Sequence, residues 1–151
     1  MTEKILTPIV AEWLQGQGYY VACEVMLCGY CDLIGCKWEE RIGRRKPPMQ
    51  EIIAVELKIK DIRGVLYQGK SNKRVADYSY AAMPLEFCAK MRPQTLDLFK
   101  KIGVGLLGVD LVLGVNVIIP APKNDIKHNP NVCRRLWSFR LRHRKAENNG
   151  R

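Results

Sequence analysis

The sequence predicts an α/β fold in which helices flank a mixed central sheet. Apolar runs rich in β-branched residues, typical of buried strands, alternate with segments of helical periodicity. The first strands are linked as hairpins and the later ones through helices, which favours both antiparallel and parallel pairing. A chain of 151 residues with 47% hydrophobic content is long enough to bury the core of one such domain.

The N-terminal half begins with a helix over residues 3–16. Val10, Trp13 and Leu14 recur there at helical spacing, Thr2 is the expected N-cap, and Gly16 provides the stop. Strands are predicted next, each bounded by glycine or proline, at 19–27, 30–38 and 52–61.

Helices and strands are also predicted to alternate in the C-terminal half. Glycines make the helix over 62–74 imperfect, and a proline begins the helix over 93–102. The remaining strands are expected at 77–82, 103–109 and 111–119, and a basic helix or arm at 131–145. We expect one domain over 1–120 and a basic arm over 121–151 that packs on it or extends from it.

The net charge of +10 is concentrated at the C-terminal end. Residues 121–151 carry 9 Lys or Arg against 2 Asp or Glu. Such a patch suits a polyanion, but a solvated tail that keeps the protein soluble explains the charge as well. No apolar run approaches the roughly 20 residues that span a bilayer, and the N-terminus lacks a signal pattern. The expected location is cytoplasmic.

Four of the six cysteines lie between Cys23 and Cys36. Cys28 and Cys31 have CxxC spacing, but no second CxxC or pair of histidines follows at the distance of a zinc ribbon. Small buried apolar side chains on strands are the favoured interpretation, with a bound metal as the alternative.

Charged residues interrupt the apolar strand over 52–61. Glu56 and Lys58 are two positions apart, so an extended strand would place them on one face. Burying a charged pair at the end of a core strand costs desolvation energy, which indicates a site. Asp32 lies early in the preceding strand, although a turn aspartate that caps backbone amides is the competing explanation.

These residues carry a family resemblance. The segment 29–34 with Asp32, followed after a hairpin by 55–58 with Glu56 and Lys58, resembles the PD-(D/E)XK nuclease superfamily, the restriction-endonuclease-like fold. That family has an acid on the second strand and acid-any-lysine on the third, within an αβββαβ core. The similarity covers roughly residues 3–110, although Cys31 stands where the family usually has proline.

The resemblance implies a Mg²⁺-dependent or Mn²⁺-dependent deoxyribonuclease. Asp32, Glu56 and the backbone carbonyl of Leu57 would be the metal ligands, with Glu3 as a further candidate. Lys58 would orient the attacking water and offset charge in the transition state. Gln68 would make a second contact to the substrate or to the lysine.

DNA is the expected partner. The phosphate-binding cations are expected in the hairpin loop, on the following helix and on the C-terminal arm: Arg41, Arg44, Arg45, Lys46, Lys70, Arg134, Arg135, Arg140 and Arg142. The expected reaction is endonucleolytic hydrolysis in repair, restriction, junction resolution or a mobile element. The alternative is a catalytically inactive nucleic-acid-binding module on the same fold. A homodimer is a reasonable expectation because cutting two strands usually takes two sites, and the strand over 111–119 is one candidate interface.

Overall fold

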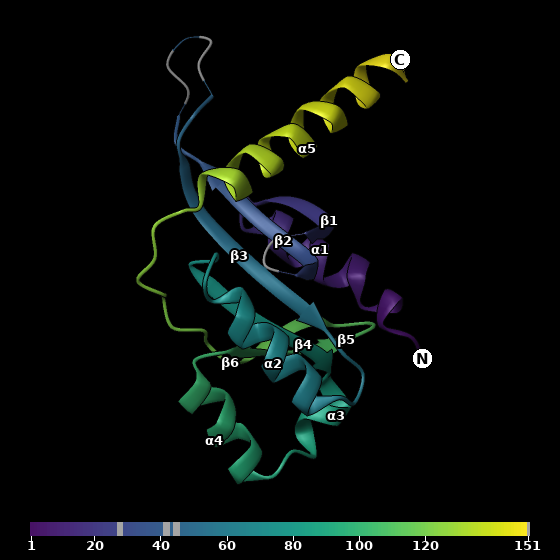
Figure 1. Ribbon diagram of the computed structural model, residues 1–151. Coiled ribbons are helices and arrows are strands. Elements are labelled where there is room, and N and C mark those ends of the chain that lie inside the picture. Colours follow the sequence, from purple (N-terminus) through teal and green to yellow (C-terminus); the bar gives the residue numbers. More distant parts are fainter. Residues whose placement is uncertain (27–28, 41–42, 44–45, 151) are drawn as a thin grey trace.

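The computed structural model describes residues 1–26, 29–40, 43 and 46–150 (Figure 1). The helical segments are η1 (Glu3–Ile5), α1 (Thr7–Gly16), α2 (Ile62–Asn72), α3 (Leu85–Ala89), α4 (Pro93–Ile102) and α5 (Pro130–Asn149). The strands are β1 (Tyr20–Met26), β2 (Tyr30–Trp38), β3 (Met49–Leu57), β4 (Tyr78–Pro84), β5 (Gly105–Asp110) and β6 (Gly114–Ile119).

One six-stranded sheet, in the order β1-β2-β3-β4-β5-β6, forms the centre of the molecule. β1, β2 and β3 pair antiparallel, β4 lies parallel to β3, β5 lies parallel to β4, and β6 returns antiparallel. The parallel pairs occur where a helix connects the strands, since a parallel partner requires a crossover. The predicted mixed α/β architecture is therefore confirmed.

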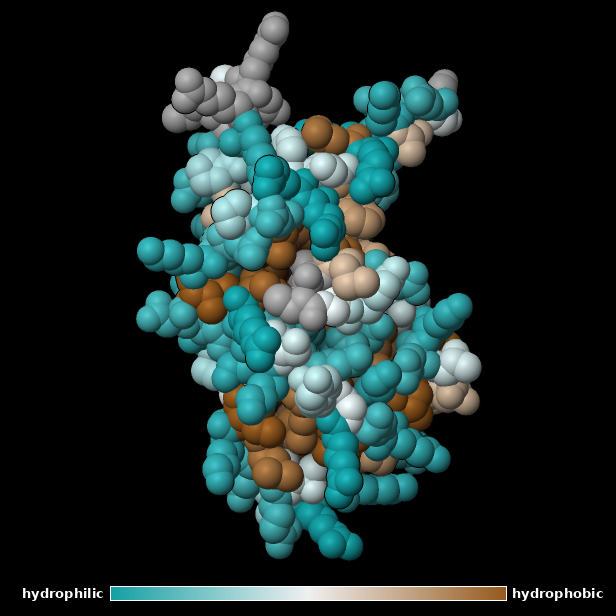
Figure 2. Space-filling model, viewed as in Figure 1, coloured by the Kyte–Doolittle hydropathy of each residue, from teal (hydrophilic) through white to brown (hydrophobic). Residues whose placement is uncertain are grey.

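Helices cover both faces of the sheet. On one face, Leu6, Val10 and Leu14 at the N-terminal end of the chain pack against side chains of β2 to β5. On the other face, α2 and α4 cover β4 and β5, and the first turns of α5 cover β1 to β3. Successive side chains of β3 point to opposite faces, so Ile53 and Val55 belong to the first cluster while Ala54 belongs to the second. Most of the surface in Figure 2 is hydrophilic.

Several boundaries differ from those predicted. The first helical segment divides into η1 and α1, because Pro8 occupies the first turn of α1. β3 ends at Leu57 rather than at residue 61, so Lys58 follows the strand instead of belonging to it. β6 begins only at Gly114, because the Asp110 carboxylate accepts hydrogen bonds from the N–H groups of Val112 and Leu113 and holds a turn there. That turn exposes 90% of Val112.

The segment that leads into α5 is fastened to the sheet by Asp77. The Asp77 carboxylate is buried, accepts a hydrogen bond of 2.7 Å from the N–H of Ile52 and lies 2.7 Å from Nε2 of His128. Asn124 adds two hydrogen bonds, to the carbonyls of Ala76 and Asp77. These contacts set where α5 begins.

The C-terminal half of α5 extends beyond the sheet (Figure 1). Residues 141–150 are exposed, whereas Val132 and Leu136 in the first turns are buried. The basic arm expected from the sequence is thus a helix that packs at its beginning and projects at its end. Among the described residues, no helix has the length and apolar character needed to cross a membrane.

The replacement Asp77→Ala tests the fastening of this segment. It leaves the buried N–H of Ile52 without an acceptor and His128 without its carboxylate, so we expect the free energy of unfolding to fall by about 2–4 kcal/mol in urea titrations. Asp97→Ala on the exposed surface of α4 is the control and should change it by less than about 0.5 kcal/mol. Equal stabilities of the two variants would contradict the assigned role.

Candidate functional site

Asp32 bridges the start of β2 and the end of β3. Leu33 pairs with Val55 in the antiparallel register, so the next facing positions are Asp32 and Glu56. The Asp32 carboxylate also accepts a hydrogen bond of 2.8 Å from the N–H of Leu57. This bond fixes one carboxylate at the point where β3 ends. The proposed alternative, a local cap on a turn, does not describe it, because the donor comes from another strand.

Glu56 is the most buried acid of the site. Only 2% of its surface is exposed, and Nδ2 of Asn72 lies 3.4 Å from Oε2 as its hydrogen-bond donor. Burial raises the pKa of Glu56 to about 8, and the neighbouring Asp32 carboxylate adds to the rise, while Asn72 and Lys58 oppose it. The two acids therefore repel each other in a poorly solvated place, which favours a bound proton or a cation.

Lys58 joins this edge of the sheet from just beyond β3. Its N–H donates to the carbonyl of Ala82 on β4, and its Nζ lies 3.5 Å from Oε1 of Glu3. Lys58 also lowers the pKa of Glu56, so its ammonium is close enough to act on that carboxylate. The contact of Glu3 with the site is this ion pair with Lys58. Its expected role as a metal ligand stays a prediction.

Gln68 and Asn72 are four residues apart on α2 and therefore share a face of that helix. Oε1 of Gln68 is buried and has no hydrogen-bond partner among the described residues. A buried acceptor without a donor is costly, so it marks a position where a ligand, a water or a moving side chain would be stabilised. Asn72 was not predicted as a site residue, because its contact with Glu56 depends on the packing of α2 against β3.

The chemistry of these side chains fits a hard divalent cation. Carboxylate oxygens are the ligands that Mg²⁺ prefers, and a cation between Asp32 and Glu56 would offset their repulsion. Within the described residues, no three Asp, Glu, His or Cys side chains form a metal-binding group. A cation here would need backbone oxygens, water or substrate to complete its shell, which is usual for Mg²⁺. The N–H of Leu57 donates its hydrogen bond to Asp32, and the carbonyl of Leu57 stays the predicted third metal ligand.

Glu24 on β1 is a further acid beside Asp32. Cys23 pairs with Leu33 and Val25 pairs with Cys31, so Glu24 and Asp32 occupy the intervening positions of the two strands. Glu24 has a φ of 53°, the one positive value among non-glycine residues of the described chain. The sequence carries no signal for this conformation.

The predicted DNA-binding cations lie apart from one another. Arg41, Arg44 and Arg45 fall outside the described residues, and Lys46 is exposed just before β3. Lys70 is exposed on α2. On α5, Arg134 and Arg135 donate hydrogen bonds to Asn131 and to the carbonyl of Met26, and Arg142 lies over Phe139.

Arg140 contacts three aromatic rings, whereas Arg142 lies over one. Its guanidinium carbon lies 4.7 Å from the centroid of Trp38, 5.7 Å from Trp137 and 5.9 Å from Tyr20. These contacts attach α5 to β1 and β2. They also keep this guanidinium half-buried, so the exposed arginines of α5 are better placed to meet a phosphate.

The cysteines are unpaired in the described chain. Cys31, Cys36, Cys88 and Cys133 are buried, as expected of small apolar side chains, while Cys23 is exposed. Burial raises the pKa of Cys36 to about 12, which keeps it a thiol. Cys28 of the CxxC motif lies outside the described residues.

The replacement Glu56→Gln tests the electrostatics of the site in the absence of metal. Wild-type Glu56 holds its proton up to about pH 8 when folded, but ionises near pH 4.5 when unfolded. Its stabilising contribution is thus complete below pH 4.5 and is lost as pH rises through 8. In EDTA, the variant should gain stability relative to the wild type between pH 5 and 9, by on the order of 2 kcal/mol in thermal or urea unfolding.

Glu12→Gln, on the exposed side of α1, is the matched control for the Glu56 variant. A difference between Glu56→Gln and wild type that stays constant from pH 5 to 9 would show that Glu56 ionises freely in the folded protein.

Comparisons with protein-family models, with curated proteins and with solved structures find no match to this chain. Its function is therefore argued from the geometry of the site.

Proposed function

We propose that this protein is a metal-dependent nuclease that hydrolyses DNA phosphodiester bonds, with Asp32, Glu56 and Lys58 as its central residues. The observation that carries the proposal is the convergence of the two acids at the end of β3, where Asp32 accepts from the N–H of Leu57 and raises the pKa of Glu56. Lys58 comes two residues after Glu56, and its Nζ lies 3.5 Å from Oε1 of Glu3. The element order α1-β1-β2-β3-α2-β4 supports the likeness to the PD-(D/E)XK superfamily.

Each residue has a role that its environment supports. Asp32 and Glu56 would hold Mg²⁺ or Mn²⁺, which supplies charge neutralisation at the phosphate and lowers the pKa of water when bound. Asp32 is held in place by Leu57, and Asn72 orients the Glu56 carboxylate. Lys58 is half-buried, so its ammonium can orient the attacking water and offset negative charge that develops on the phosphate. Gln68 brings a buried acceptor that has no donor among the residues that the structure describes.

Deoxyribonucleic acid is the proposed substrate because the described surface offers exposed cations on several sides of the site. Lys46 before β3, Lys70 on α2 and several arginines of α5 are exposed. The charge is strongly positive overall, with 25 Lys or Arg against 15 Asp or Glu. Phosphate contacts of this kind attract nucleic acid with little sequence preference.

A cleavage panel tests the proposal. Labelled duplex, single-stranded, flap and junction DNA, and RNA of the same sequences, are incubated with Mg²⁺ or Mn²⁺ and analysed on denaturing gels. The wild type should cut at least one DNA form, and Asp32→Asn, Glu56→Gln and Lys58→Ala should each lower the rate by roughly 10²-fold or more.

The matched controls for this panel are Asp97→Asn and Lys100→Ala, which remove exposed charges on α4 and should retain activity. Cleavage by the site variants at the wild-type rate would refute the assigned residues. Binding of DNA without cleavage of any form would refute the enzyme and favour the inactive binding module.

A further inference from the structure

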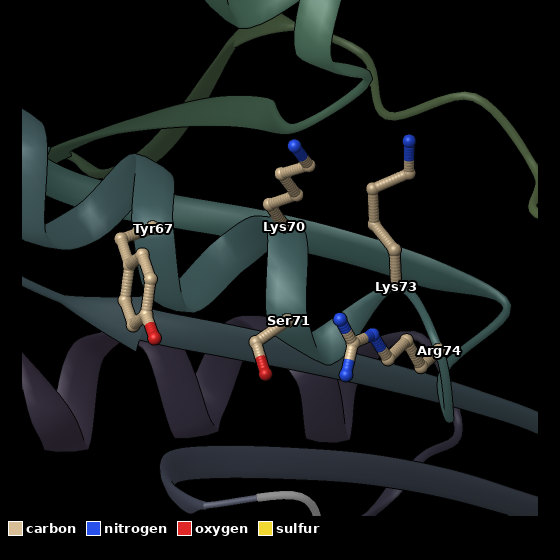
Figure 3. Close-up of a pocket in the computed structure, with 5 residues that line it drawn as sticks. All are labelled: Tyr67, Lys70, Ser71, Lys73 and Arg74. Atoms are coloured by element: carbon tan, nitrogen blue, oxygen red, sulfur yellow. The ribbon is translucent and has the colours of Figure 1, made fainter.

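A pocket separate from the acidic site lies on the solvent side of α2. Its volume is about 580 Å³, and it is lined by Tyr67, Lys70, Ser71, Lys73 and Arg74. Figure 3 shows Lys70 and Lys73 extending to one side of α2, while the hydroxyl groups of Tyr67 and Ser71 point to the other side. The guanidinium of Arg74 turns back toward Ser71. The pocket therefore combines an aromatic ring, a hydroxyl and three cations.

The cations of this pocket lack acidic partners. No carboxylate is among the described residues that line it, and neither Lys70 nor Arg74 forms an ion pair within the described chain. Lys73 is held by a hydrogen bond of 2.7 Å from its Nζ to the carbonyl of Ile102. Positive charges without acidic partners on one surface repel one another, and a bound anion would offset this repulsion. A phosphate group suits the side of α2 where Ser71 and Arg74 lie near each other, because it accepts from hydroxyl and guanidinium groups.

Tyr67 adds an exposed aromatic ring to the pocket, and an inorganic anion would not need that ring for binding. It is 78% exposed, and its ring contacts no other aromatic ring in the part of the chain that the structure describes. An exposed tyrosine of this size leaves apolar surface in water. Beside phosphate-binding cations, such a ring is suited to stacking with a nucleobase.

The pocket and the acidic site share one helix. Tyr67 and Ser71 are each followed directly by a residue on the inner side of α2, namely Gln68 and Asn72, and Asn72 contacts Glu56. One helical turn, about 5.4 Å, separates Tyr67 from Ser71, and a single nucleotide can bridge that distance. α2 therefore holds the pocket on its outer side and a contact to Glu56 on its inner side.

We propose that this pocket binds an unpaired nucleotide of the nucleic-acid substrate, with its base stacked on Tyr67, its phosphate held by Ser71 and Arg74, and Lys70 adding positive charge from the other side of α2. Bases inside a duplex already stack on both faces, so only a base that has left the duplex can lie on this ring. The inference rests on the proposed function and specifies its substrate class: DNA that contains single-stranded segments, such as flaps, forks or junctions, in preference to intact duplex.

Binding measured in EDTA tests the pocket without any cleavage. Fluorescence anisotropy is recorded for a labelled oligo(dT) and for a hairpin duplex of the same length. Tyr67→Ala should weaken oligo(dT) binding about 10-fold and leave duplex binding unchanged, whereas Tyr67→Phe, which keeps the stacking surface, should bind like the wild type. Lys70→Gln and Arg74→Gln should weaken oligo(dT) binding and lower its salt slope by about 0.7 each.

Lys100→Gln on α4 is the matched charge control and should bind oligo(dT) like the wild type. The proposal is overturned if Tyr67→Ala weakens both ligands equally or neither, or if Lys70→Gln and Arg74→Gln behave like Lys100→Gln. A nuclease with unaltered oligo(dT) binding in Tyr67→Ala would refute the pocket alone. Oligo(dT) binding that depends on Tyr67, in a protein that cuts no DNA, would support the pocket and refute the nuclease.

Discussion

The hydrogen bond from the N–H of Leu57 to the Asp32 carboxylate is the contact on which the site depends. It joins two strands at the point where β3 stops and brings a second carboxylate beside Glu56. A buried acid beside a half-buried one is unfavourable for stability alone, because desolvation and mutual repulsion both disfavour the charged forms. In the proposed function, a bound cation and Lys58 offset this repulsion at the end of β3. The rest of the fold holds the strands that carry them.

Elements on both faces of the sheet position side chains near Asp32 and Glu56. The N-terminal segment places Glu3 beside Lys58, while α2 places Asn72 beside Glu56 and its outer side carries Tyr67 and the pocket cations. The proposed catalytic residues and the proposed nucleotide pocket thus lie on the two sides of one helix. The projecting half of α5 adds exposed positive charge at a distance from the acids.

Much of the fold could be predicted from the sequence, because periodicity, glycine and proline report on local structure. The strands and the crossover helices were predicted in this way, and the register of β2 and β3 brings the predicted Asp32 and Glu56 to facing positions. The end of β3 was not, since the apolar alternation continues through Ile59 while the pairing stops at Leu57. The contact of Asn72 with Glu56 and the unusual φ of Glu24 depend on packing between distant segments, which no local pattern encodes. The five-residue α3 was too short to show a periodicity.

In the proposed site, Asp32 and Glu56 share one metal ion. Anomalous diffraction from crystals grown with Mn²⁺ tests it most directly, because the signal locates the ion without reference to any activity. A single strong peak is expected within about 2.0–2.3 Å of both carboxylates, and it should be absent from crystals of Asp32→Asn. A protein crystallised at saturating Mn²⁺ with no peak between these two side chains would contradict it.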